Sequence, residues 1–160
     1  MPSDAWREPL PILTGKAWAF GLDVTAALVL APEWRGATDL GRHLLTSVDP
    51  DFPARVARGD FVVAGNDFAA GTEDDSGVRA LVAAGIGAVI AYSFDPRFAE
   101  HALAHALPVA SVNEALAIHT GARLRVDLEG ARVANLSSGD RYPIRNLSED
   151  VLARLRARRA

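Results

Sequence analysis

Thr72, Glu73, Asp74 and Asp75 place one hydroxyl and three carboxylates in consecutive positions of a loop that follows Gly71. A carboxylate in such a loop can act as a general base or can contact a cationic or hydroxyl-bearing ligand. Several carboxylate oxygens together can hold a hard cation. A structural interpretation is also open, because the free N–H groups and the dipole at the start of a helix favour acids and hydroxyls there. The residue types alone leave these three interpretations open.

The charges around this loop suggest which residues support it. Three acids within one turn need a counter-ion, and Arg79, one helical turn further on, is the nearest candidate in sequence. We expect the side chains of Asn66 and Asp67 to position the loop through hydrogen bonds to its backbone. His101 and His105 have an i, i+4 spacing compatible with metal binding, but no acid lies at a diagnostic position between them. We therefore expect them to occupy an exposed helix face.

Two apolar runs on either side of the loop indicate the elements that position it. Residues 61–64 (FVVA) and 88–91 (AVIA) are typical of strands that are buried on both faces. The sequence between them predicts a helix that Asp75 or Ser76 caps and that ends at Ala84. A strand, a helix and a strand of these lengths form a βαβ unit with parallel strands. The loop is thereby placed at a helix N-terminus.

The remaining segments extend this pattern. Strict alternation over 124–128, a turn at 129–130 and a returning strand over 131–136 predict an antiparallel hairpin. The sequence predicts an α/β fold with a parallel-strand core and an antiparallel C-terminal hairpin. The other expected elements are a strand over 16–20, a buried apolar run over 24–30, a short helix over 38–46 capped by Thr38 or Asp39, one helical turn at most over 50–58, a helix over 95–107, a strand over 108–112 and a helix over 148–159.

Composition limits the classes of protein that the chain can represent. Its 160 residues, 49% of them hydrophobic, fit one domain over 1–160 with a short N-terminal extension over 1–14. The chain has no cysteine, so it can form neither a disulfide nor a thiolate-held iron–sulfur cluster. A net charge of −3 argues against nucleic-acid binding, and the basic run 154–159 fits the end of a helix. No apolar run is long enough to span a membrane, so we expect a cytoplasmic protein.

The order of these segments resembles that of the small subunit of 3-isopropylmalate dehydratase, which corresponds to the swivel domain of aconitases. Residues 85–101 (GIGAVIAYSFDPRFAEH) match a family pattern close to G-I-x-A-V-I-A-x-S-F-x-x-I-F-x-x-N. A family motif close to G-D-N-I-D-T-D falls on 21–27 (GLDVTAA), and one close to N-F-G-C-G-S-S-R-E-H falls on 67–76 (DFAAGTEDDS). The resemblance extends from about Gly15 to Leu152 and implies a single swivel-type β/β/α domain.

The resemblance also implies an activity. It implies a hydro-lyase subunit that is inactive alone and acts on a small hydroxy acid. The expected partner is a large subunit that carries a [4Fe–4S] cluster, so no cofactor is expected on this chain. In the family, a loop serine acts as the base and a loop arginine grips a substrate carboxylate. By position, the catalytic candidates are Thr72, Glu73 and Asp74, and the substrate-binding candidates are Gly71, Asp75, Ser76, Asp23 and Thr25.

The chain departs from the family at these positions. The two carboxylates of the D-T-D motif are missing, and Asp74 stands where the family has arginine. A carboxylate at this position repels a carboxylate substrate that a guanidinium would attract. The substrate is therefore expected to be altered. The alternative is a non-catalytic, divergent swivel domain that acts as a binding, regulatory or scaffold module, or as a homo-oligomer.

Overall fold

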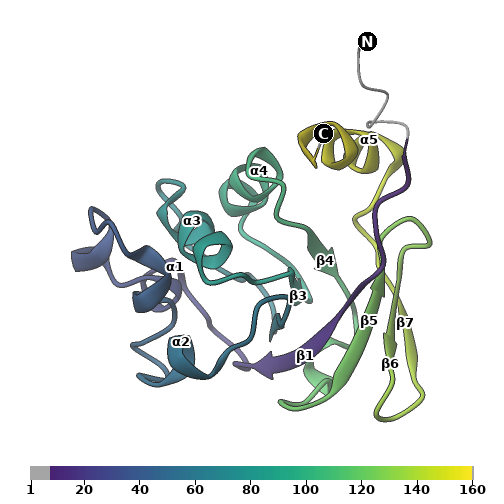
Figure 1. Cartoon of the computed structure of the whole chain (residues 1–160), viewed down its shortest axis with the longest axis horizontal. Coiled ribbons are helices and arrows are strands. Elements are labelled where there is room, and N and C mark those ends of the chain that lie inside the picture. The colour runs from purple at the N-terminus through teal and green to yellow at the C-terminus, as the bar shows by residue number, and fades with distance from the viewer. Residues whose placement is uncertain (1–7, 160) are drawn as a thin grey trace.

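The computed structural model describes residues 8–159, which form one curled sheet with helices packed against it (Figure 1). The strand order is β4-β3-β2-β1-β5-β6-β7, so the first strand of the chain lies at the centre of the sheet. The strands are β1 (Leu13–Ala19), β2 (Phe61–Ala64), β3 (Ala88–Ala91), β4 (Val109–Ser111), β5 (Arg123–Asp127), β6 (Arg132–Asn135) and β7 (Arg141–Pro143).

The helices are short, apart from those that cover the sheet. In Figure 1, the helices coloured blue to teal lie on one side of β1, whereas the antiparallel strands lie on the other side. Three 3₁₀ helices accompany them: η2 (Pro32–Trp34), η3 (Leu40–His43) and η4 (Ala115–Ala117). The α-helices are α1 (Ala26–Val29), α2 (Phe52–Arg55), α3 (Ser76–Ala83), α4 (Pro96–Ala104) and α5 (Glu149–Arg159).

The parallel half of the sheet confirms the predicted βαβ units. β1, β2, β3 and β4 are parallel, with Val62 opposite Val89 and Val89 opposite Val109. β2 and β3 are buried along their whole length because each contributes to two cores. Val62 and Val89 pack with α3 and α4 on one face, and their neighbours along the strands pack against the antiparallel half on the other. Uninterrupted apolar runs are the expected signature of such strands.

Two predicted segments differ from the structure. The run 24–30 is not uniformly buried: Val24, Val29 and Leu30 are buried, but Thr25 and Ala27 are exposed, and 26–29 form the single turn α1. Short apolar runs do not distinguish a strand from a helical turn. The helix expected over 38–46 is the 3₁₀ helix η3, and the side chain at its N-cap makes no capping hydrogen bond. The single turn expected within 50–58 is confirmed as α2.

The antiparallel half confirms the predicted hairpin and adds one strand. β5 pairs with β6, and β7, which was not expected, pairs with the other edge of β6.

The two ends of the described part of the chain pack against this half of the sheet. β1 begins at Leu13, so Leu13 and Thr14 belong to the sheet and not to an N-terminal extension. Residues 1–7 of that expected extension lie outside the described residues. The predicted C-terminal helix is confirmed as α5, which Arg156 anchors to Glu129 with an Nε–Oε1 distance of 2.8 Å. None of the helices within residues 8–159 combines the length and apolar character needed to cross a membrane.

Candidate functional site

The acidic loop connects the C-terminal end of β2 to the start of α3. The N–H of Gly71 donates to Asp95 Oδ2 at 3.1 Å, and the N–H of Asp67 donates to Ser93 Oγ at 2.8 Å. Ser93 and Asp95 therefore hold the loop through their side chains. We expected Asn66 and Asp67 to do this, but within residues 8–159 neither side chain makes a hydrogen bond to the loop. The reason is that the residues after β3 converge on the loop from the neighbouring strand.

The segment that carries Asp23 and Thr25 lies against the same loop. Ala69 donates its N–H to the Val24 carbonyl at 2.7 Å, and Ala26 donates to the Ala70 carbonyl at 2.9 Å. Thr25 and Ala70 form a parallel bridge. The two stretches that correspond to the family motifs are thus neighbours in space, although the bridged residues Thr25 and Ala70 are 45 positions apart in sequence.

A small pocket, with room for little more than one water molecule, opens between the loop, α1, α3 and α4. Its apolar side is formed by Val29, Leu30, Ala69 and Phe98. Its polar side is formed by Arg35, Thr72, Glu73, Asp74 and Ser76. Of the residues proposed from sequence, Gly71, Asp75, Asp23 and Thr25 do not line this pocket. The pocket combines an apolar wall with one guanidinium and two carboxylates.

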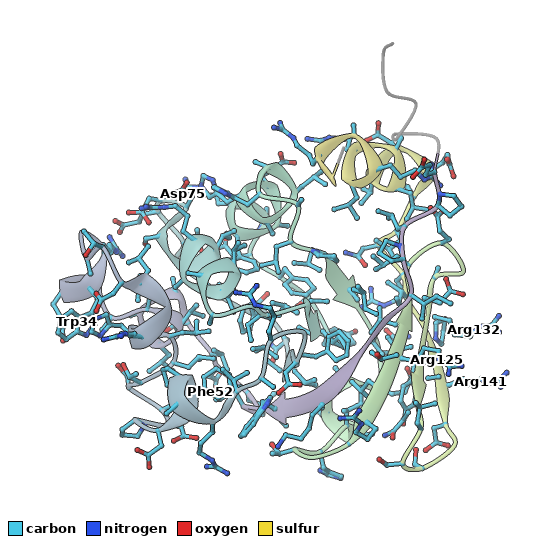
Figure 2. All side chains as sticks on the ribbon, in the orientation of Figure 1. Trp34, Phe52, Asp75, Arg125, Arg132 and Arg141 are labelled. Atoms are coloured by element: carbon cyan, nitrogen blue, oxygen red, sulfur yellow. The ribbon has the colours of Figure 1, made fainter. Side chains whose placement is uncertain are left out.

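Arg35 is the one functional group at this pocket that sequence reasoning missed. It follows η2, whose last residue is Trp34 (Figure 2). The Trp34 ring stacks on that of His43 with centroids 3.8 Å apart. The Nη1 atom of Arg35 lies 3.2 Å from Oε2 of Glu73, with 31% of the Arg35 side chain and 70% of the Glu73 side chain exposed. The only sequence signal for Arg35 is the excess of acids in the loop, which requires a cation but does not say which one.

Asp74 and Thr72 are held by structural hydrogen bonds. Oδ1 of Asp74 accepts from the Ser76 hydroxyl at 2.5 Å and from the Ser76 N–H at 2.9 Å. These bonds hold the pKa of the Asp74 carboxyl below its ordinary value. The buried Thr72 hydroxyl donates to the Ala69 carbonyl at 2.6 Å. Asp75 is the N-cap residue of α3, one of the two expected, but its side chain makes no capping hydrogen bond, and the Asp74 carboxylate instead accepts from the N–H of Ser76, the first residue of the helix.

Asp75 (Figure 2) forms a second ionic group, which does not line the pocket. Its Oδ1 lies 3.0 Å from Nε of Arg79, and its Oδ2 lies 2.9 Å from Nε2 of His105. The bond with His105 is the main reason that the pKa of the Asp75 carboxyl is lowered. The prediction that Arg79 is a counter-ion of the loop acids is confirmed.

The loop carboxylates do not converge on one point. Glu73, Asp74 and Asp75 each have a separate partner, namely Arg35, Ser76 and the pair Arg79 and His105. Within the described part of the chain, no group of three or more His, Cys, Asp or Glu residues could hold a metal ion. The geometry does not support the hard-cation interpretation of the loop or a metal pair at His101 and His105.

Comparison with known proteins gives a consistent family. No family model matches the chain. It is 31% identical over 148 residues to the 3-isopropylmalate dehydratase small subunit of Nautilia profundicola, a match that covers 89% of each chain. The small subunit from Moorella thermoacetica is 34% identical over 137 residues, or 83% of this chain and 82% of the relative. Small subunit 1 of Archaeoglobus fulgidus is 34% identical over 138 residues, or 84% of this chain and 86% of the relative.

A solved structure supports the same relationship. The crystal structure of 3-isopropylmalate dehydratase from Methanocaldococcus jannaschii superposes with a TM-score of 0.83 at 25% identity, covering 93% of this chain and 96% of that one. The relatives found by sequence and the solved structure bear the same enzyme name, and each match covers most of the chain. The chain therefore belongs to the family of 3-isopropylmalate dehydratase small subunits.

Proposed function

We propose that this chain is the small subunit of a hydro-lyase of the 3-isopropylmalate dehydratase type, that Arg35 at the rim of its pocket binds one carboxylate of a small hydroxy acid, and that the large subunit completes the site. The single observation that carries the proposal is the placement of the Arg35 guanidinium at the rim of a pocket with an apolar wall. The buried apolar wall fixes the rim and leaves no room for the rest of the substrate, which the large subunit must enclose. A guanidinium pairs with a carboxylate through two hydrogen bonds.

Arg35 compensates for the arginine that the loop lacks. Asp74 occupies the position of the family's loop arginine, but its carboxylate is bound to Ser76. The pair between Arg35 and Glu73 is partly exposed, and exposed pairs contribute only about 0 to 1 kcal/mol. A bidentate bond to a substrate carboxylate in a sheltered pocket contributes more, about 1.5 to 3 kcal/mol per charged hydrogen bond. A substrate carboxylate therefore replaces Glu73 as the partner of Arg35.

Glu73 is the residue of this chain that we propose as the general base. Its carboxylate lies at the pocket rim, and its only side-chain partner in the described structure is Arg35. Binding of substrate to Arg35 frees this carboxylate to take a proton. Thr72 and Asp74 are less suited to the role, because their oxygens are already bound to Ala69 and Ser76. A positioned general base contributes typically 10² to 10⁴ in rate.

The residues of this chain do not fit an iron–sulfur cluster. The sequence has no cysteine, and residues 8–159 contain no group of three or more possible metal ligands. We propose that the [4Fe–4S] cluster implied by the family resemblance belongs to a large subunit.

Two exposed leucines support docking of that large subunit beside the loop. The side chains of Leu22 and Leu116 meet over Gly65, where a Cβ would lie 2.8 Å from one and 3.4 Å from the other. They are 58% and 53% exposed. Tyr92, which donates its N–H to the Gly65 carbonyl, adds a third exposed apolar side chain. Apolar clusters of this kind on a folded surface mark protein interfaces.

The proposal is tested by reconstitution. The purified chain is mixed with a 3-isopropylmalate dehydratase large subunit that carries its cluster, and dehydration of 3-isopropylmalate is followed by ultraviolet absorbance of the unsaturated product. Activity that needs both chains supports the proposal. A stable complex that turns over neither 3-isopropylmalate nor other small 2-hydroxy dicarboxylic acids would reject the catalytic role.

A further inference from the structure

The antiparallel half of the sheet has a strongly cationic outer face. We call it the arginine face and define it by Arg123 and Arg125 on β5, Arg132 on β6 and Arg141 on β7. All of them are exposed, whereas the residues between them, such as Leu124 and Val133, are buried in the core. Figure 2 shows Arg125, Arg132 and Arg141 projecting together on the side opposite to the helices.

The strand register places these cations close to one another. Arg125 and Arg141 lie on either side of Ala134, each directly opposite it in the ladder. Arg132 is two positions from Ala134 on the same strand, so its side chain points to the same face. With strands about 4.8 Å apart, the arginine face is about 10 Å wide across its three strands.

The arginine face carries charge that the fold itself does not neutralise. Within residues 8–159, none of its four arginines forms an ion pair, whereas Arg35, Arg79, Arg154 and Arg156 all do. Arg42, Arg58 and Arg97 are also without an ion pair in this part of the chain, but they lie on separate elements, so the clustering is what distinguishes the arginine face. A shortage of acids is not the reason, because the chain has 20 acids and 17 Lys and Arg residues. Asp127 lies on the same face, directly opposite Arg132 in the ladder, but the two form no ion pair, and Oδ1 of Asp127 accepts from the Gly130 N–H at 2.9 Å. Arg125 and Arg141 are separated across the sheet only by Ala134.

We propose that the arginine face binds an acidic segment of a protein partner. Each cation is an arginine, whose planar guanidinium pairs with a carboxylate through two parallel hydrogen bonds and is more weakly hydrated than a lysine ammonium. The Asp and Glu side chains of such a segment supply negative charges that pair with the arginines on the neighbouring strands. The arginine face and the pocket at Arg35 are formed by different elements, so this inference does not depend on the proposed activity.

Two other partners fit the arginine face less well. The other outward residues on these strands are Asp127, Ala134 and Pro143, so the face offers no aromatic ring on which nucleic-acid bases could stack. Its small width also limits the number of phosphates it could contact. A second copy that docked through the same face by two-fold symmetry would bring arginines against arginines. An acidic protein segment meets neither difficulty.

The test uses the full chain and a fluorescent hexaglutamate peptide, with binding followed by anisotropy at low and high salt. The variant R125Q/R132Q/R141Q should bind the peptide more weakly by about tenfold, because exposed pairs contribute up to about 1 kcal/mol each. The control R42Q/R58Q/R97Q removes the same charge from three other exposed arginines and should bind like the wild type. A single-stranded oligonucleotide and phosphatidylserine vesicles are measured in parallel.

The inference stands if the peptide binds in a salt-dependent manner and only the first variant loses affinity. It is overturned if the wild type does not bind the peptide or if both variants lose affinity equally. It is also overturned if the oligonucleotide or the vesicles bind more tightly than the peptide and the same variant abolishes that binding. Thermal unfolding of each variant confirms that it is folded, and the single variants R125Q and R141Q replace the triple variant if it is not.

Discussion

Nε2 of His105 lies 2.9 Å from Oδ2 of Asp75, and this contact ties the C-terminal end of α4 to the start of α3. Arg79 binds the other carboxylate oxygen of Asp75. Asp74 and Ser76, which flank Asp75 at the start of α3, line the candidate pocket. The ion pairs of Asp75 therefore position the helix end that forms one wall of the pocket.

The stabilisation by Asp75 should depend on pH. Because the pKa of its carboxyl is lowered in the folded chain, the stabilisation is complete above the unfolded pKa of about 3.9 and is lost as the pH falls through the folded value. Asp75→Asn should lower the free energy of unfolding at pH 7 by about 0.5 to 1 kcal/mol, since both ion pairs are partly exposed. Urea unfolding from pH 7 to pH 3 should show this difference shrinking at the acid end. A difference that does not change with pH would show that Asp75 acts through packing.

Asp74→Ala should destabilise the chain through loss of the α3 cap. The expected loss is about 1 kcal/mol in the free energy of unfolding, because the Ser76 N–H and hydroxyl lose their acceptor. Asp74→Asn should retain part of the cap. The neighbouring exposed residue provides the control, since Glu73→Ala should change stability by less than about 0.5 kcal/mol. Equal stability of the Ala variants at 73 and 74 would contradict the capping role.

Gly15 and Gly87 allow a close approach of backbone in the sheet. A Cβ at Gly15 would lie 2.5 Å from the Gly59 carbonyl oxygen, and one at Gly87 would lie 2.8 Å from the same atom. Because the obstacle is backbone, Gly15→Ala and Gly87→Ala should each lower the free energy of unfolding by about 1 to 3 kcal/mol. Gly36→Ala, where no heavy atom lies within 4 Å of the added Cβ, should have little effect. Thermal unfolding of the three variants checks this ranking. A loss of stability in Gly36→Ala as large as that in the other two variants would contradict it.

Leu22→Asp should weaken assembly with the large subunit. A charge in the centre of the proposed apolar interface must be desolvated without a partner, which costs affinity. Leu136→Asp is the matched control, because Leu136 is 51% exposed and follows β6, away from the acidic loop. Analytical size-exclusion of mixtures with the large subunit should show the complex for the control and free subunits for Leu22→Asp. Intact assembly of the Leu22 variant would place the interface elsewhere.

Much of the fold could be predicted because the sequence pattern reports burial directly. Val62 and Ile90 belong to uninterrupted apolar runs, which the two-sided burial of parallel strands requires. The alternation of apolar and polar residues from Leu124 to Leu128 also reports burial, since one face of that hairpin is buried and the other is exposed. Strand β7 could not be predicted, because a three-residue strand has no detectable period and forms only through its pairing with β6.

The candidate site was harder to predict than the fold. The position of the loop at the start of α3 followed from the βαβ pattern, and Arg79 followed from helical spacing. Arg35 could not be found in this way, because its contact with Glu73 spans 38 positions and depends on how η2 folds over the pocket. The roles of Thr72 and Asp74 also needed the structure, since only hydrogen-bond geometry separates a cap from a catalytic group.

Kinetics of Arg35→Gln and Glu73→Gln in the reconstituted enzyme test the central claim most directly. If Arg35 anchors a substrate carboxylate, Arg35→Gln should raise the KM for 3-isopropylmalate by about tenfold to a hundredfold. If Glu73 is the base, Glu73→Gln should lower kcat by about a hundredfold or more without raising KM, and Arg42→Gln should change neither. A KM for Arg35→Gln equal to that of the wild type, with kcat of Glu73→Gln also unchanged, would show that the substrate binds elsewhere.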